Sequence, residues 1–154
     1  MLKKRRSFFS GIESVFSEHE EIKKMGIPYL PLEELMKRSD IITLHLPLTS
    51  ETHHLISASM LALCKPTAVL INTARGNVVD IDALAQCLNE GKIAGAGVDV
   101  FEKEPPLPMG HSLCGAPNVV LVPHVGYATR EAFDIRIEIE MEHIREYLQS
   151  LKNV

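Results

Sequence analysis

The sequence alternates between short apolar runs and segments in which apolar residues recur at helical spacing, and this alternation constrains the fold more than any other feature. Four of the apolar runs are nearly continuous, with few polar residues interleaved. Such runs are typical of strands that are covered on both faces, as in a parallel sheet. We therefore expect four parallel strands, at residues 41–46, 68–72, 94–99 and 119–122.

Helical patterns occupy the segments between these runs. The longest, at 129–151, places apolar residues every three or four positions, which predicts an amphipathic helix that buries one stripe. Ser57 and Asp80 are candidate N-caps of two shorter helices, and Gly91 is a candidate C-terminal stop. Pro31 is expected in the first turn of a further short helix.

A strand, a helix and a second strand in repeated order imply right-handed βαβ crossovers. The expected fold class is therefore α/β, with an open parallel (Rossmann-like) sheet and helices on both faces. The chain has 154 residues and neither internal repeats nor an obvious linker, so a single domain is expected. The longest irregular segment, 102–117, is rich in Pro and Gly, and long loops in compact domains often carry function.

Composition and charge argue against several classes of function. The formal net charge is −4, whereas a nucleic-acid-binding surface needs a basic excess, and the short basic run 3–6 is interpreted as a solvated segment. The three cysteines form no C-x-x-C pair, which argues against a zinc site or a disulfide framework and favours a cytoplasmic location. No apolar run is long enough for a membrane span or a signal peptide.

Ligands bind to open parallel sheets at the carboxyl ends of the strands, so the residues that follow each expected strand are the first candidates for a site. Arg75 follows the second strand and His124 follows the fourth. Asp99 ends the third strand, with Glu102 and Glu104 close behind it. A planar guanidinium suits bidentate binding of a carboxylate, and an imidazole with a carboxylate partner suits acid–base chemistry.

Position alone leaves a structural alternative open for each of these residues. Arg75 can equally serve to hold a loop, and a lone histidine such as His124 is more often structural than catalytic. Asp99 is either a cap or a ligand contact, because a carboxylate at the end of an apolar strand is costly unless it is paired. The remaining histidines show no metal-ligand spacing, so no metal site is expected, and the adjacent His53 and His54 are interpreted as surface residues.

Three long segments of the chain resemble one known family. They read SDIITLHLPLTSETHHLIS, PTAVLINTARGNVVDIDALAQCLNEGKIAGAGVDVFEKEPP and NVVLVPHVGYATREAF. Together they look like the cofactor domain of the D-isomer-specific 2-hydroxyacid dehydrogenases, over residues 27–151. The resemblance is specific because the segments occur in the family's order and at its spacing. It implies that residues 1–154 form a partial dinucleotide-binding domain.

The resemblance also implies roles for individual residues. The arginine of INTARG, Arg75, corresponds to the group that binds the substrate carboxylate. The histidine of PHVG, His124, corresponds to the acid–base group, and the second glutamate of VFEKEP, Glu104 rather than Glu102, to its carboxylate partner. Asp99 resembles the residue that contacts the nicotinamide carboxamide. The other residues that match cofactor-lining positions are Leu46, Pro47, Thr73, Ala74, Gly126 and Tyr127, together with Arg75 and His124 themselves.

The implied activity is hydride transfer between NAD and a D-2-hydroxy acid or its 2-oxo acid. Arg75 would fix the 2-oxo acid, His124 would move the proton, and Glu104 would stabilise the imidazolium. NADP is left as an alternative cofactor, because Ser10 follows the strand-like segment 6–9 where the family's ribose-binding acid is expected. The expected partners are a small 2-hydroxy or 2-oxo acid, with a homodimer or a missing N-terminal half left open.

No G-x-G-x-x-G occurs in the chain, although the resemblance places this phosphate-binding loop at the first βα turn. We therefore expect the chain to begin after the family's central strand, which leaves the first of the four strands with an unpaired edge. Two hypotheses follow. The chain is the catalytic half of an oxidoreductase, as the retained Arg75, Glu104 and His124 favour, or it is a truncated remnant or a dinucleotide-sensing interaction module without catalysis, as the absent loop favours.

Overall fold

The computed structural model describes residues 24–26, 28–104 and 107–152. The described residues fall into two compact units that divide between Pro123 and His124. The basic run at 3–6, the strand-like segment 6–9 and Ser10 lie outside the described residues.

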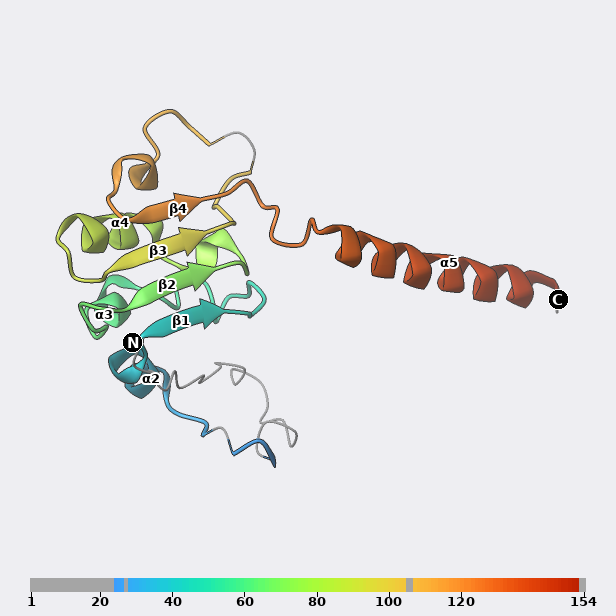
Figure 1. Cartoon of the computed structure of the whole chain (residues 1–154), viewed down its shortest axis with the longest axis horizontal. Helices are drawn as coiled ribbons and strands as arrows, with labels where there is room; N and C mark the ends of the chain where they lie inside the picture. The colour runs from blue at the N-terminus through green and yellow to red at the C-terminus, as the bar shows by residue number, and fades with distance from the viewer. Residues whose placement is uncertain (1–23, 27, 105–106, 153–154) are drawn as a thin grey trace, which may run out of the picture. The chain divides into compact units, whose positions relative to one another are not determined.

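The described part of the first unit is built on a parallel sheet of four strands that follow one another in sequence order (Figure 1). The strands are β1 (Ile41–Leu44), β2 (Val69–Asn72), β3 (Gly95–Val98) and β4 (Val119–Leu121). Leu44, Asn72 and Val98 are register partners, so the first three strands end level with one another. The four predicted strands, their parallel arrangement and the α/β fold class are confirmed, although each strand is shorter than its apolar run.

The helices lie between the strands where the periodicity predicts them. The described elements of the first unit are α2 (Leu32–Arg38), α3 (Ala58–Leu61), α4 (Ile81–Asn89) and the 3-10 turns η1 (Gly76–Val78) and η2 (Ser112–Gly115). Pro31 precedes α2, and Ser57 is the N-cap residue of α3. The Asp80 side chain caps α4 by accepting a hydrogen bond from Ala83 N at 3.0 Å, and Gly91 ends that helix with a φ of +65°.

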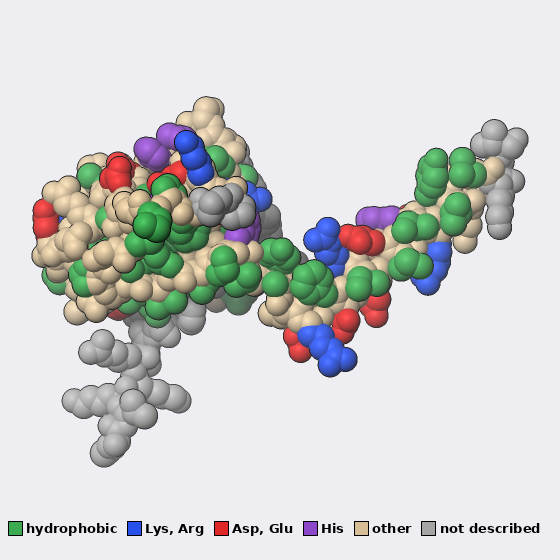
Figure 2. Space-filling view, turned by 90° about the horizontal axis from the view of Figure 1, so that it is seen from above, with side chains coloured by type: hydrophobic (Ala, Val, Ile, Leu, Met, Phe, Trp, Pro, Cys, Tyr) green, Lys and Arg blue, Asp and Glu red, His purple; other side chains and the backbone are tan. Residues whose placement is uncertain are grey.

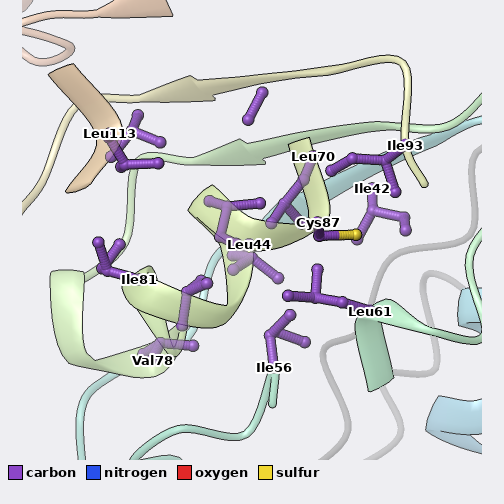
Figure 3. Close-up of a cluster of buried hydrophobic side chains, with 14 of the residues drawn as sticks. Ile42, Leu44, Ile56, Leu61, Leu70, Val78, Ile81, Cys87, Ile93 and Leu113 are labelled. Atoms are coloured by element: carbon purple, nitrogen blue, oxygen red, sulfur yellow. The ribbon is translucent and has the colours of Figure 1, made fainter. Parts of the chain in front are cut away.

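The hydrophobic core lies on one face of the sheet, where α3, α4 and η2 pack (Figure 3). Alternate strand residues point into it, because successive side chains of a strand face opposite sides. The core residues that Figure 3 labels are Ile42, Leu44, Ile56, Leu61, Leu70, Val78, Ile81, Cys87, Ile93 and Leu113. On the opposite face the strands carry more exposed side chains, such as Ile41 at 53% and Val120 at 66%.

The second unit contains the segment after β4 and helix α5 (Arg130–Lys152), which confirms the long helix expected at 129–151. Hydrophobic side chains run along this helix in Figure 2. The predicted stripe consists of Phe133, Ile137, Met141, Ile144 and Leu148, each of which is 44–56% exposed. The stripe is therefore not buried within the described residues of this unit, because they form no second helix or strand for it to pack against. None of the described helices has the length and apolar character that a membrane span requires.

Gly76 allows the turn after β2 to lie directly against the chain that follows β3. A Cβ atom at Gly76 would lie 2.1 Å from the backbone carbon and 2.3 Å from the backbone oxygen of Phe101. It would also lie 2.6 Å from the backbone nitrogen of Glu102. A side chain cannot be accommodated at these distances, so the glycine is what brings η1 and the segment 101–104 together.

All three cysteines lie in the described residues and are free thiols. Burial, followed by the nearby Cys87, raises the pKa of the Cys64 thiol to about 11. Burial also raises the pKa of Cys87, although Lys92 opposes this effect. Both thiols are therefore protonated near neutral pH and are poor nucleophiles.

Replacing Gly76 with alanine should lower the free energy of unfolding by about 1–3 kcal/mol, because η1 or the segment 101–104 must move to admit the methyl group. Gly97→Ala in β3 is the matched control, since a Cβ atom there meets nothing within 4 Å. We expect that variant to be neutral or stabilised by up to about 1 kcal/mol through the loss of freedom in the unfolded chain. Urea unfolding followed by circular dichroism measures both, and equal losses would contradict the close approach at Gly76.

The raised pKa of Cys64 predicts a specific loss of stability in alkaline solution. The unfolded thiol ionises near its ordinary pKa of 9.0, whereas the folded thiol resists ionisation up to about 11. The stabilisation from the neutral buried thiol is therefore complete below pH 9.0 and is lost as the pH rises towards about 11. Thermal unfolding from pH 8 to 11 should show a shallower alkaline decline in Cys64→Ala than in the unmodified protein. The exposed Cys114, changed to alanine, is the control and should leave the decline as it is.

Candidate active site

The turn that follows β2 presents Arg75 at the carboxyl edge of the sheet. Its backbone is extended, with φ −148° and ψ 142°, and its side chain is exposed. Nη1 of Arg75 donates a hydrogen bond to the carbonyl oxygen of Ala74 at 2.6 Å. Thr73 is exposed beside it, whereas Ala74 is buried. An exposed guanidinium in this place has the planar array of N–H donors that binds a carboxylate in bidentate fashion.

Asn72, the last residue of β2, makes two side-chain hydrogen bonds to the backbone of this turn. Its side chain is fully buried, at 0% exposure. Oδ1 accepts a hydrogen bond from Ala74 N, and Nδ2 donates one to the carbonyl oxygen of Arg75, each at 3.0 Å. Asn72 is not among the site residues expected from the sequence. The signal that points to it is a polar residue at the end of an otherwise apolar strand, next to an arginine.

The chain that follows β3 carries two of the expected acidic residues. Asp99 is buried, with 4% of its surface exposed, and its backbone N–H donates to the carbonyl oxygen of Asn72 at 3.0 Å. Glu104 is exposed, and its Oε1 accepts a hydrogen bond from the backbone N–H of Phe101 at 2.8 Å. This bond closes a tight turn over 101–104, which is the segment that Gly76 approaches.

Glu102 bonds to a histidine of its own loop. The Glu102 Oε2 atom lies 3.2 Å from Nε2 of His111, whose side chain is only 8% exposed. Nδ1 of that imidazole accepts a hydrogen bond from Leu113 N at 3.3 Å, so the neutral ring carries its proton on Nε2. The pair borders a small cavity of about 190 Å³ that is lined by Glu102, Lys103, Leu107, Pro108 and His111. The pair is not expected from the sequence, and it bonds Glu102 to a residue of its own loop.

The loop after β1 contributes two further candidates to the same edge. Leu46 is buried and Pro47 is exposed. The carbonyl oxygen of Pro47 accepts a hydrogen bond from Oγ1 of Thr52 at 2.7 Å, and the same oxygen atom of Thr52 accepts one from Thr49 N at 2.8 Å. Because Thr52 is fully buried, it anchors the loop and holds Pro47 in place at the surface.

The adjacent His53 and His54 are exposed, which agrees with their interpretation as surface residues. Their rings are stacked, with centroids 4.1 Å apart. No group of three histidine, cysteine, aspartate or glutamate side chains suited to a metal ion occurs in the part of the chain that the structure describes.

His124, Gly126 and Tyr127 belong to the second unit. His124 is half-buried and has a φ of +54°, a left-handed conformation that is uncommon for a residue with a side chain. Its ring meets that of Tyr127 edge to face, with centroids 6.0 Å apart, and Tyr127 meets Phe133 in the same way at 6.1 Å. His54 and Asn118 share the left-handed conformation of His124, which histidine and asparagine adopt more often than other residues with a side chain.

The expected residues of the first unit follow the carboxyl ends of β1, β2 and β3, whose last residues are in register. They are Leu46, Pro47, Thr73, Ala74, Arg75, Asp99 and Glu104. The distance between Glu104 and His124 stays a prediction, because the two residues belong to different units.

The residues at this edge fit the nicotinamide end of a dinucleotide. The exposed Pro47 and Thr73 offer an apolar and a polar surface, and the carboxylate of Asp99 is the kind of acceptor that a carboxamide N–H requires. The chain has no G-x-G-x-x-G to receive the phosphates, so the fit concerns the nicotinamide end alone.

Known protein families, relatives and solved structures match most of the chain. The model of the D-isomer specific 2-hydroxyacid dehydrogenase NAD binding domain matches residues 11–126. A glyoxylate reductase from Thermococcus litoralis is 49% identical over 125 residues, which are 81% of this chain and 37% of the relative. A glyoxylate/hydroxypyruvate reductase B from Pectobacterium carotovorum is 50% identical over 112 residues, 73% of this chain and 35% of the relative. The chain thus spans no more than 37% of the length of these relatives.

Solved structures show the same fold. A D-lactate dehydrogenase from Sporolactobacillus superposes with a TM-score of 0.80 at 38% identity, over 86% of this chain and 43% of that one. A D-lactate dehydrogenase from Aquifex aeolicus, complexed with NAD and lactic acid, superposes with a TM-score of 0.75 at 35% identity, over 88% and 45% of the two chains. The chain belongs to the D-isomer specific 2-hydroxyacid dehydrogenase family, and residues 11–126 are NAD binding domain sequence of that family.

Proposed function

We propose that this chain provides the catalytic edge of an NAD-dependent oxidoreductase that transfers a hydride between the nicotinamide and a D-2-hydroxy acid or its 2-oxo acid. The observation that carries the proposal is the exposed guanidinium of Arg75 at the end of β2. The close approach at Gly76 keeps the turn that carries Arg75 against the segment 101–104, in which the Glu104 carboxylate lies.

Arg75 binds the carboxylate of the substrate in this proposal. Two parallel N–H···O bonds from a planar guanidinium define the orientation of a carboxylate as well as its position. The carbonyl carbon next to that carboxylate is thereby held where it can exchange a hydride with the cofactor, and such fixed orientation supplies a large part of an enzyme's rate enhancement.

His124 exchanges the proton that accompanies the hydride. As an imidazolium it donates that proton to the oxygen of the 2-oxo acid, and as an imidazole it removes the proton from the hydroxy acid. Glu104 is the proposed partner that stabilises the imidazolium and sets the tautomer of the neutral ring. The choice of Glu104 rather than Glu102 rests on the resemblance, because both carboxylates have partners in the structure: Glu102 bonds to His111 and Glu104 to the backbone N–H of Phe101.

NAD supplies the hydride acceptor or donor when it is bound. Leu46 and Pro47, together with Thr73 and Ala74, would line the nicotinamide side of the site. Asp99 would accept a hydrogen bond from the carboxamide, and Gly126 and Tyr127 are the other proposed cofactor contacts. A small 2-oxo acid such as glyoxylate is the proposed substrate, since the relatives that are 49% and 50% identical are named glyoxylate reductase and glyoxylate/hydroxypyruvate reductase B.

A chimera tests the proposal. Residues 27–151 of this chain would replace the matching segment of the Thermococcus litoralis glyoxylate reductase. The chimera should reduce glyoxylate with NADH. A chimera that folds and binds NADH without turnover would instead favour the second candidate function, a non-catalytic interaction module on the same fold, and the absence of G-x-G-x-x-G in this chain also favours a role without catalysis.

Within the chimera, Arg75→Lys should lower kcat/KM for glyoxylate by about 10- to 100-fold, because a lysine keeps the charge but loses the second parallel hydrogen bond. Both kcat and KM should change, while the affinity for NADH should not. Arg38→Lys, at an exposed arginine in the last turn of α2, is the matched control. An Arg75→Lys variant with unchanged kcat/KM and no NADH binding would make Arg75 a cofactor residue instead.

His124→Asn in the same chimera should lower kcat by about 10²- to 10⁴-fold and remove the dependence of the rate on imidazole ionisation, since asparagine cannot transfer the proton. Kinetics from pH 5 to 9 measure both effects. A variant that keeps the pH profile of the parent chimera would exclude His124 as the acid–base group.

The chain by itself should turn over glyoxylate or pyruvate with NADH far below the rate of an ordinary enzyme, about 10 per second. The reason is that it contains no G-x-G-x-x-G to hold the cofactor phosphates. The decrease in NADH absorbance over time, measured on the purified chain, gives the rate. Turnover at an ordinary rate would reveal a different binding site for the cofactor phosphates.

A further inference from the structure

We propose that Asn72 is the positioning residue of Arg75. Its buried side-chain amide bonds to the backbone of Ala74 and of Arg75 in the turn 73–75, and it thereby fixes the direction in which the guanidinium points. This inference rests on the proposed function, in which Arg75 binds the substrate carboxylate. Asn72 itself is buried beneath the turn and acts through Arg75 rather than on the substrate.

Both ends of the Asn72 amide are matched to backbone groups of the turn. The oxygen accepts from the N–H of Ala74, and the nitrogen donates to the C=O of Arg75, each at 3.0 Å. The side-chain amide of asparagine offers an acceptor oxygen and a donor nitrogen in one short planar group. Aspartate lacks the donor, and an apolar residue would leave the buried Ala74 N–H without this acceptor.

The amide is anchored to the centre of the sheet. Asn72 pairs with Leu44 of β1 and with Val98 of β3, and its backbone C=O accepts from Asp99 N at 3.0 Å. A side chain on a strand that is paired on both sides is a rigid support. Binding and catalytic groups are held more accurately by such elements than by free loops.

Ala74 links the side chain of Asn72 to the guanidinium of Arg75. The N–H of Ala74 is held by the Asn72 oxygen, and the C=O of Ala74 accepts from Nη1 of Arg75 at 2.6 Å. The C=O of Arg75 receives a second donor, the N–H of Val78, at 3.2 Å. The backbone on both sides of the arginine is thus held by Asn72, and the direction of its side chain depends on that backbone.

The test uses the ¹⁵N-labelled chain as it exists, studied by NMR. Asn72→Ala removes both side-chain bonds. Asn72→Asp keeps the acceptor for Ala74 N and removes the donor to Arg75 C=O. Asn77→Ala, five positions further in the same loop region, is the matched control, because the bond that Asn77 makes to His54 uses its backbone oxygen. The readouts are the hydrogen exchange rate of the Ala74 amide and the chemical shift and relaxation of Arg75 Nε.

In Asn72→Ala, exchange at Ala74 should accelerate by about tenfold or more, and the Arg75 Nε signal should shift and become more mobile. In Asn72→Asp, Ala74 should stay protected while Arg75 Nε still shifts. Asn77→Ala should change neither. A fast-exchanging Ala74 with an unchanged Arg75 Nε signal would mean a purely structural role and overturn the proposal. If Asn72→Ala does not fold, the Asn72→Asp variant tests the proposal. An unchanged Arg75 Nε signal in Asn72→Asp also overturns the positioning role of Asn72.

Titration of the glyoxylate reductase chimera with oxamate, a stable analogue of a 2-oxo acid, in the presence of NADH separates this inference from the proposed function. Oxamate should shift Arg75 Nε in the chimera, and the chimera with Asn72→Ala should need about tenfold more of it. If oxamate leaves Arg75 unaffected in the chimera, the assignment of the carboxylate site fails. The exchange and Nε measurements on Asn72 still decide the positioning role on their own.

Discussion

The in-register parallel pairing of β1, β2 and β3 is the constraint on which the rest of the structure depends. Leu44, Asn72 and Val98 lie side by side, so three loops leave the sheet at the same level and on the same edge. Parallel strands require a crossover between them, and the crossover helices pack on the core face and return each strand to the same starting edge. Candidate residues from three distant parts of the sequence are therefore neighbours in space.

Two contacts hold the turn of Arg75 at that edge. At Gly76 the missing side chain lets the turn of Arg75 touch the backbone of Phe101. At Asn72 a buried amide satisfies both an N–H and a C=O of the same turn. Both contacts restrict the backbone next to Arg75. Proteins place catalytic groups accurately by supports of this kind.

Most of the fold and part of the site follow from local sequence signals. Continuous apolar runs mark the four strands, and Asp80 and Gly91 mark the ends of α4 through capping chemistry that depends only on near neighbours. Arg75 and Asp99 are recognisable because a charge next to an apolar strand needs an explanation. The pairing of Glu102 with His111 is different, since it joins residues nine positions apart across an irregular loop that has no periodicity. The spacing of the apolar residues of α5 likewise predicts a helix face, but it does not predict which surface packs against that face.

The sequence by itself determines the order of strands and helices, the helix caps and the family to which the motifs belong, because each depends on residues that are adjacent in the chain or repeat at a regular interval. Only the tertiary structure decides that Asn72 lies beneath the turn of Arg75, and that Gly76 lies against Phe101. Those contacts depend on which strands pair and in what register. A shift of register by one residue would turn Asn72 to the other face of the sheet and remove both of its bonds to the turn.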